Sequence, residues 1–332
     1  MDTSLKKHGF RYCLVCKSRL KKRGKTAAGR QRWYCRVCTQ SSVRKRTDLR
    51  HLFTFEQFIE WLLGKASQAE LGVASRTFRH QTSWCWDVPV PIVQTGEIHH
   101  AVIIDGIRVG GRTCLVARTT EYVIDWVWVP YESSEYWSLL LQRIPPPMYV
   151  VCDGQRGMLK ALSLWWPNTT VQRCRFHAWL NVKAKLTLNP QTIQGKQLLQ
   201  LARDMQHITT RRQARCWKRR LSAWYRKHSA FIQEKTIKQY PKRGERTWCY
   251  THTRVRSAYR QLHAITDDLM RSIYRRSPRL PATTNHLEGG INSHIRDKLR
   301  THRGMKNEHQ RVLVNWYLYG RTEGRKAPRN CL

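Results

Sequence analysis

The segment from residue 148 to 166, MYVVCDGQRGMLKALSLWW, restricts the possible folds more than any other part of the chain. Its apolar run Tyr149–Cys152 is short and continuous, which is typical of a strand buried on both faces. Asp153 and Gly154 end this run, and apolar side chains then recur at helical spacing up to Trp166. A buried strand that leads into a helix is half of a βαβ unit, so the segment predicts an α/β fold.

Asp153 allows two interpretations at this stage. A carboxylate at the end of a buried strand is costly unless it is paired or binds a metal ion, which favours a functional site. The dipeptide Asp153-Gly154 is also a common turn sequence, which would give the acid a local structural role. The residues of this segment alone do not separate the two.

The charge of the chain indicates its partner. Its 61 Lys and Arg residues exceed its 22 Asp and Glu residues, so the formal net charge is +39. Such a surplus repels itself unless a polyanion binds, and it is interleaved with aromatic residues rather than confined to a tail. Nucleic acid is therefore the favoured partner. A membrane is disfavoured, because the sequence has no apolar run of 18 residues and no amphipathic anchor.

The cysteines and the N-terminus indicate the compartment. The chain has 11 Cys, and no apolar segment near its start matches a secretory signal. We therefore expect a cytoplasmic protein in which the thiols are free or bind metal.

Residues 1–50 carry two C-x2-C pairs, Cys13 with Cys16 and Cys35 with Cys38. Each pair can place two thiolates on one tight turn, and two such turns complete a tetrahedral site for one structural Zn²⁺. The spacing predicts a zinc ribbon whose folding depends on the metal; the alternative is four unrelated free cysteines. Basic residues between the pairs are candidates for contact with a DNA backbone: Lys21, Lys22, Arg23, Lys25, Arg30 and Arg32, continued by Arg44, Lys45 and Arg46.

Residues 51–96 have the pattern of a helix-turn-helix followed by a linker. Apolar residues from Phe55 to Leu63 recur at helical spacing, Gly72 marks a turn, and Ser75 is the expected cap of a second helix. A simple helical hairpin without DNA contacts is the alternative. In the helix-turn-helix interpretation the residues facing the major groove are Arg76, Thr77, Arg79, His80 and Gln81.

From residue 97 to 188 the pattern predicts three consecutive strands, then helix, strand, helix, strand and helix. Hairpins followed by right-handed crossovers give a mixed five-stranded sheet covered by helices. Asp105, expected at the end of the first strand, and Asp153, at the end of the fourth, converge if these strands are neighbours. Asp125 lies in the apolar third strand, and we interpret it as structural.

The remaining sequence divides into two parts. Residues 189–281 are basic and helical, with apolar stripes that indicate a helical core, although an exposed Trp could instead stack on a base. Residues 282–332 begin with a Thr cap that places Glu288 in the first or second turn of a helix. From the residues alone, Glu288 is also explained as an acid favoured by the helix dipole.

Taken together, the chain resembles the transposases of bacterial insertion sequences in the Mutator-like superfamily. The resemblance extends over nearly the whole chain and rests on five motifs. They are Ile104-Asp105-Gly106, Cys152-Asp153-Gly154, Cys174-Arg175-Phe176-His177, Thr284-Asn285-His286-Leu287-Glu288-Gly289-Gly290 and His302-Arg303-Gly304-Met305.

The resemblance implies a ribonuclease H-like core with the catalytic triad Asp105, Asp153 and Glu288, interrupted by the helical insertion 189–281. Three carboxylates suit two hard cations, Mg²⁺ or Mn²⁺, about 4 Å apart for in-line displacement at phosphorus. The implied activity is cleavage at the ends of the element in double-stranded DNA and joining of the 3′-OH to target DNA. Because the two ends of the element must be held together, the resemblance also implies a homodimer on DNA. The implied location is the bacterial cytoplasm, in association with the nucleoid.

Three questions stay open at the level of sequence. Cys174 and His177 match a Cys-x2-His element of the family and are expected to be structural or to face DNA, with half of a zinc site as the alternative. The chain could be a DNA-binding regulator derived from a transposase, in which the core no longer catalyses. It could also be a ribonuclease H-like nuclease that cleaves without joining.

Overall fold

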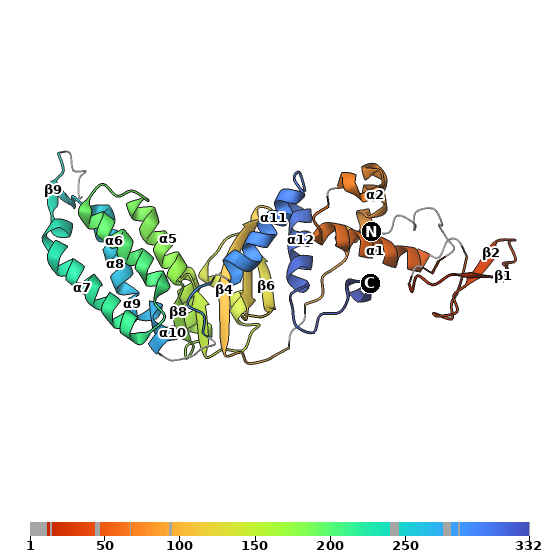
Figure 1. Ribbon diagram of the computed structural model, residues 1–332, viewed down its shortest axis with the longest axis horizontal. Coiled ribbons are helices and arrows are strands. Elements are labelled where there is room, and N and C mark those ends of the chain that lie inside the picture. Colours follow the sequence, from red (N-terminus) through yellow and green to blue (C-terminus); the bar gives the residue numbers. More distant parts are fainter. Residues whose placement is uncertain are drawn as a thin grey trace. The chain divides into compact units, whose positions relative to one another are not determined.

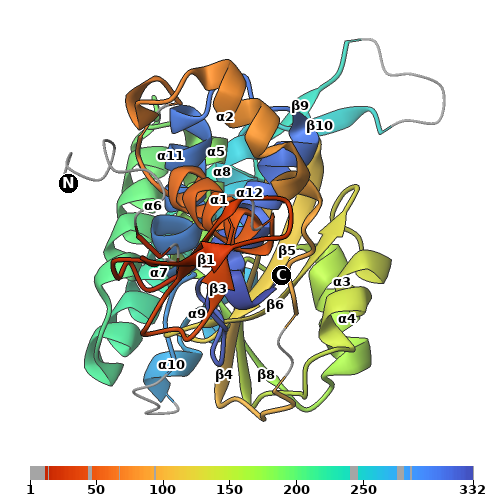
Figure 2. The same ribbon diagram turned by 90° about the vertical axis from the view of Figure 1, so that its right-hand side faces the viewer.

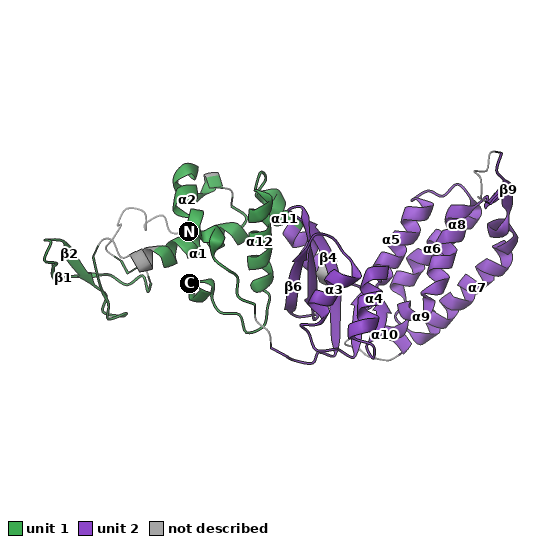
Figure 3. Ribbon diagram, turned by 180° about the vertical axis from the view of Figure 1, so that it is seen from behind, with its two compact units in different colours: residues 1–92, 296–332 green, residues 93–295 purple. Residues whose placement is uncertain are grey.

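The computed structural model describes residues 12–13, 15–43, 47–66, 68–92, 95–239, 246–274, 280–284 and 286–331. The chain forms two compact units (Figure 3). Unit 1 combines Met1–Ile92 with Arg296–Leu332, and unit 2 consists of Val93–Ile295. The ends of the sequence therefore contribute to one unit, and the middle of the chain forms the other.

A small antiparallel sheet with the order β1-β2-β3 opens unit 1 (Figure 1). Every residue of β1 is exposed, which is expected of a strand composed of lysine, arginine and glycine. The ribbon has little apolar material of its own, so its four cysteines are the natural source of its stability. The strands are β1 (Lys21–Lys25), β2 (Gln31–Tyr34) and β3 (Ser41–Ser42).

Helices make up the rest of unit 1. The amphipathic face of α1 buries Phe55, Phe58 and Leu62, and the Phe55 ring meets the Trp316 ring of α12 edge-on at 5.3 Å. The expected capping of the second helix is wrong: Ala74 occupies the cap position without a side-chain hydrogen bond. The elements are α1 (Thr47–Leu63), η2 (Gln68–Leu71), α2 (Ser75–Gln81), η3 (Ser83–Asp87), α12 (Asn307–Tyr319) and η6 (Pro328–Cys331).

The centre of unit 2 is a five-stranded sheet with the order β6-β5-β4-β7-β8. β6, β5 and β4 are antiparallel, and β4, β7 and β8 are parallel, which confirms the predicted mixed sheet. One expectation is corrected, because the first strand continues to Val109 and Asp105 lies in its middle. The strands are β4 (Ala101–Val109), β5 (Arg112–Arg118), β6 (Val123–Val129), β7 (Tyr149–Cys152) and β8 (Thr170–Arg173).

Two helices cover one face of this sheet, α3 (Ser134–Leu141) and α4 (Arg156–Trp165), which lie side by side (Figure 2). Their buried side chains form one apolar core with alternate residues of β4, including Val102 and Ile104. Because side chains alternate along a strand, Asp105 belongs to the opposite face of the sheet. The sheet therefore separates its apolar core from the face that carries the acid.

The helices after β8, from residue 175 to 274, share one core, so the predicted insertion 189–281 packs with the helix that precedes it. Trp217 and Trp224 are buried in this core, and Tyr259 stacks on Trp224, which supports the packing interpretation of its aromatic stripes. The helices are α5 (Arg175–Leu186), α6 (Ile193–Asp204), η4 (Met205–His207), α7 (Arg211–Gln233), α8 (Thr253–Ala264), α9 (Thr266–Leu269) and α10 (Arg271–Tyr274). A hairpin of β9 (Lys235–Ile237) and β10 (Trp248–Tyr250) lies between α7 and α8.

After the insertion, the chain returns as the π-helix η5 (His286–Asn292) and continues into α11 (Ser293–Thr301). Short π-helical segments are rare and often occur at functional sites. Within the described ranges, none of the helices has both the length and the apolar character needed to cross a membrane.

Candidate active site and metal centre

The four cysteines of the ribbon form a cluster of the size that zinc requires. The sulfur atoms of Cys13, Cys16, Cys35 and Cys38 all lie within 4.8 Å of one another. Cys16 Sγ lies 3.4 Å from Cys35 Sγ, and Cys13 Sγ lies 3.8 Å from Cys38 Sγ. A tetrahedron with Zn–S bonds of about 2.3 Å has edges of about 3.8 Å, so the cluster fits this ion.

The thiols of this cluster differ in pKa. Hydrogen bonding from Ser18 lowers the pKa of the Cys16 thiol to about 6. Hydrogen bonding with Cys16 raises the pKa of Cys38 to about 12, because a thiolate at one position disfavours a thiolate at the other. A cation among the sulfurs removes this conflict, since it stabilises every thiolate at once.

Asp153 lies directly after β7, in a tight turn. Its Oδ1 accepts a hydrogen bond of 2.9 Å from the backbone N–H of Gln155, so the turn interpretation of the sequence is supported. The guanidinium group of Arg173 donates to the carbonyl oxygen of Asp153 from Nε at 3.1 Å and from Nη2 at 2.7 Å. The backbone and one carboxylate oxygen of Asp153 are therefore both held in place.

Gly154 is required by this arrangement. Its φ is +74°, a conformation that other residues adopt at a cost. A Cβ atom at this position would lie 2.0 Å from Cζ of Arg173, so a side chain would also displace the guanidinium group that holds Asp153.

Asp105 lies on the strand next to β7. In the parallel pairing of β4 with β7, Ile103 lies opposite Val151. These two residues are 48 positions apart in the sequence, and so are Asp105 and Asp153. The ladder between β4 and β7 ends at Ile103 and Val151; Asp105 follows two residues later within β4, and Asp153 follows directly after β7 ends. Asp105 is only 7% exposed, and its Oδ2 accepts a hydrogen bond of 3.1 Å from Nδ2 of Asn292.

Glu288 belongs to η5, the helix that ends at Asn292. Its side chain lies outside the described residues, so the structure gives no distance from it to either aspartate. The segment around it is fixed on both sides. Asn292 contacts Asp105, and the backbone N–H of Arg175 donates to the carbonyl oxygen of Ala282 at 3.2 Å.

Cys174 and His177 contact the same returning segment. Cys174 caps α5 by accepting from the backbone N–H of His177 at 3.5 Å, and it also accepts from the backbone N–H of Thr284 at 3.3 Å. Burial raises the pKa of the Cys174 thiol, but hydrogen bonds from His177 and Thr284 outweigh burial and lower it overall. These contacts connect the pair to Thr284, and among the described residues neither belongs to a group of three or more side chains that could hold a metal ion.

Glu132 is a residue that the sequence analysis missed. It lies between β6 and α3, and its Oε1 would be 2.6 Å from a Cβ atom placed on Gly106, the neighbour of Asp105. Burial raises the pKa of Glu132, and the nearby carboxylate of Asp153 raises it further. An acid before a Ser cap resembles an ordinary helix start, so the sequence offered no signal for it.

Asp125 has the structural role that the sequence suggested. It is 1% exposed, and Arg143 contacts both of its oxygens, from Nε to Oδ2 at 2.9 Å and from Nη2 to Oδ1 at 3.0 Å. The backbone N–H of Trp126 donates to the same Oδ1 at 2.7 Å. This two-pronged salt bridge explains a buried acid without a catalytic role.

The candidate DNA-contacting residues are on the surface of unit 1. The side chains of the ribbon candidates are exposed, as are those proposed to face the major groove, while Phe78 of α2 points into the interior. Arg23 lies over the Tyr34 ring at 4.5 Å, which stiffens its side chain. Arg44, Lys45 and Arg46 lie outside the described residues. The exposed set is Lys21, Lys22, Arg23, Lys25, Arg30, Arg32, Arg76, Thr77, Arg79, His80 and Gln81.

The fold and these residues define an α/β protein whose sheet is consistent with a ribonuclease H-like core, preceded by a four-cysteine cluster. No protein-family profile matches the chain. Over 90 residues the chain is 36% identical to a transposase for insertion sequence element IS6120 from Mycolicibacterium smegmatis. The match covers 26% of this chain and spans 25% of that relative's length. The similarity is therefore partial, and the chain matches about a quarter of the length of that transposase.

Proposed function

We propose that the chain is a DNA transposase of an insertion sequence. It binds the terminal inverted repeats of the element, cleaves DNA strands there and joins the 3′-OH to target DNA. The observation that carries the proposal is that Asp105 lies on β4 and Asp153 directly follows β7, the parallel neighbour of β4, while Asn292 ties the helix of Glu288 to Asp105. The partial similarity to an insertion-sequence transposase supports the same activity.

The acids suit the metal ions that this chemistry uses. Carboxylate oxygens are hard ligands, and Asp105, Asp153 and Glu288 would hold two Mg²⁺ or Mn²⁺ ions. When bound, the ions would stabilise charge on the attacking and leaving oxygens of an in-line displacement.

The surrounding residues prepare this site. Asn292 orients the Asp105 carboxylate through its amide N–H, and Arg173 fixes the backbone of Asp153. Glu132 adds a further carboxyl group beside Gly106, and burial together with the nearby Asp153 carboxylate raises its pKa.

The remaining parts of the chain would bring DNA to this site. The ribbon with one structural Zn²⁺ and the exposed face of α2 are proposed to grip the ends of the element. Their exposed cations would contact phosphates, and the net charge of +39 supports a polyanionic partner. A homodimer would hold the two ends together.

Cleavage and joining assays separate the candidate functions. Purified protein is mixed with Mg²⁺ and duplex DNA that carries the sequences flanking the coding region, together with a target plasmid. A transposase nicks the duplex at the element end and transfers the 3′-OH to the plasmid. A regulator derived from a transposase binds the same duplex without cleaving it, and a nuclease cleaves it without joined product.

A further inference from the structure

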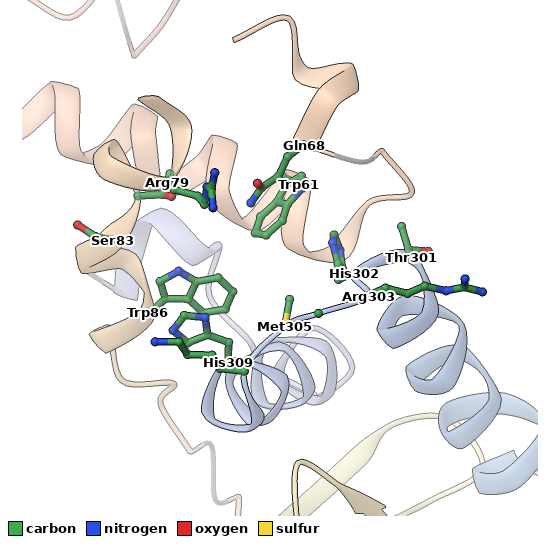
Figure 4. A pocket seen from close by; sticks show the side chains of 13 residues that line it. Trp61, Gln68, Arg79, Ser83, Trp86, Thr301, His302, Arg303, Met305 and His309 are labelled. Carbon is green, nitrogen blue, oxygen red and sulfur yellow. The ribbon is translucent and has the colours of Figure 1, made fainter. Parts of the chain in front are cut away.

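Unit 1 contains a cavity of about 610 Å³ to which the proposed chemistry gives no role. It is lined by residues of α1, η2, α2 and η3 and by the turn between α11 and α12 (Figure 4). Four of the lining side chains carry aromatic rings: Trp61, Trp86, His302 and His309. The volume is in the range of cavities that bind a small organic molecule.

The rings hold one another in fixed positions. Trp86 and His309 stack with their centroids 3.8 Å apart and their planes 5° apart. The Trp61 ring meets the His302 ring edge-on at 4.7 Å, and the His302 imidazole also pairs through Nε2 with the carbonyl oxygen of Leu62 at 3.1 Å. The cavity therefore has rigid aromatic walls before any ligand arrives.

Burial disfavours charge on the rings, and longer side chains carry the charge of the cavity. Burial lowers the pKa of both His302 and His309. The cations that line the cavity are Arg79, Arg303 and Lys306, and none of the lining side chains is acidic. Arg303 extends outward from its turn, away from the rings, so its charge lies at the rim (Figure 4).

The turn that closes the cavity is the motif His302-Arg303-Gly304-Met305. Gly304 has a φ of +82°, and a Cβ atom there would meet nothing within 4 Å. Its backbone conformation alone therefore favours glycine. The tight turn places both His302 and Met305 on the cavity wall. This gives the motif a role that is separate from the proposed catalytic acids.

We propose that this cavity binds one unpaired nucleotide of a DNA strand. The flat base would lie among the aromatic rings and Met305, where stacking favours any of the four bases. Gln68 offers a polar group to the edge of the base, and Arg303 and Lys306 would meet the phosphates at the rim. A paired base cannot enter such a cavity, because its partner and neighbours enclose it.

A free nucleotide could make the same contacts in the cavity, but the basic surface beside the cavity favours a nucleotide that belongs to a DNA strand. Arg79 lines the cavity from α2, whose exposed Arg76 and Thr77 continue the polar, basic surface outward. The inference rests on the DNA binding of the proposed function and is independent of its catalytic acids. It assigns unit 1 a preference for distorted or partly single-stranded DNA.

The experiment compares two labelled duplexes of the same sequence, one fully paired and one with a single unpaired adenine in the middle of one strand. Fluorescence anisotropy gives the dissociation constant of the full-length protein for each. Stacking one base predicts that the bulged duplex binds about fivefold more tightly or better. Met305→Trp, which enlarges a side chain that lies among the rings and so fills the cavity, should abolish this preference and leave the paired duplex unaffected (Figure 4). Met305→Leu, of similar size to the original side chain, is the matched control and should keep the preference.

A photocross-link locates the base. With 5-iodouracil in place of the unpaired adenine, cross-linked peptides should contain Trp86, Met305 or His309. Equal affinity for both duplexes, or cross-links confined to unit 2, would overturn the inference while leaving the proposed function intact. Absence of binding to either duplex would remove the DNA binding that both proposals need. Competition by deoxyadenosine monophosphate as effective as that of the bulged duplex would contradict the assignment to a DNA strand.

Discussion

The thiol of Cys174 accepts hydrogen bonds from both the backbone N–H and the hydroxyl of Thr284, at 3.3 and 3.4 Å. The two residues are 110 positions apart, and the helical insertion lies between them in the sequence. Because η5 begins two residues after Thr284, this contact fixes the start of the segment that carries Glu288. Cys174 thus joins the cap of α5 to the returning chain.

Substitutions at Cys174 should separate hydrogen bonding from packing. Cys174→Ala removes an acceptor for buried groups and should lower the free energy of unfolding by about 1–3 kcal/mol. Cys174→Ser keeps an acceptor that can cap α5, so this variant should lose less than about 1 kcal/mol of its free energy of unfolding. Urea denaturation followed by circular dichroism gives both values. Equal losses for the two variants would show that the hydrogen bonds to Thr284 contribute little.

The ribbon should bind one zinc ion through its four thiolates. Elemental analysis of the purified protein should give one Zn²⁺ per chain, and Cys35→Ser should abolish it, because three thiolates leave the buried site incomplete. Cys174→Ser is the matched control, and it should keep the full zinc content. A zinc content unchanged in Cys35→Ser, or halved in Cys174→Ser, would contradict the assignment.

Gly106 should be sensitive to a methyl group because of Glu132. A Cβ atom there would lie 2.6 Å from Oε1 of Glu132, so Gly106→Ala must displace this carboxylate, at a cost of about 1 kcal/mol. Adding Glu132→Ala should remove most of the cost, and a double-mutant cycle measures the coupling. Gly289→Ala is the control, since a Cβ atom there meets nothing within 4 Å. Additive effects at the two sites would contradict the close approach.

The stability of unit 1 should fall in mild acid because of His302. Burial lowers the folded-state pKa of this imidazole below its ordinary value of 6.5, so the unfolded chain binds the proton more readily. The contribution of His302 is therefore present above pH 6.5 and is lost as the pH falls below it. Denaturation midpoints between pH 5 and pH 8 should drop less steeply for His302→Gln than for the unmodified chain. Parallel curves would exclude His302 as the cause.

Local patterns in the sequence predicted the parts of this fold that depend on neighbours along the chain. The apolar run before Asp153 is buried on both sides as β7, and the strands form the expected mixed sheet. The spacing of the cysteines predicted a cluster that the structure contains. Each of these features follows from a short stretch of sequence whose periodicity or spacing has few structural solutions.

Local sequence patterns did not predict the contacts between residues that are far apart in the chain. Nothing in either sequence neighbourhood relates Asn292 to Asp105 or Thr284 to Cys174, because a hydrogen bond across more than 100 residues is set by the folded chain. Glu132 was missed for this reason, since it approaches Gly106 only after the sheet forms. The end of β4 was misjudged because Asp105, a residue that usually interrupts strands, is stabilised there by Asn292.

Strand cleavage by Asp153→Asn tests the central claim most directly. The assay uses Mg²⁺ and duplex DNA carrying the sequences that flank the coding region, with binding measured on the same preparation. Asp125→Asn serves as the control for loss of an acid from the same sheet, because Asp125 pairs with Arg143 instead of facing the proposed site. We expect Asp153→Asn to bind the duplex like the unmodified chain and to give no cleavage, whereas Asp125→Asn still cleaves. Full cleavage by Asp153→Asn would contradict the account.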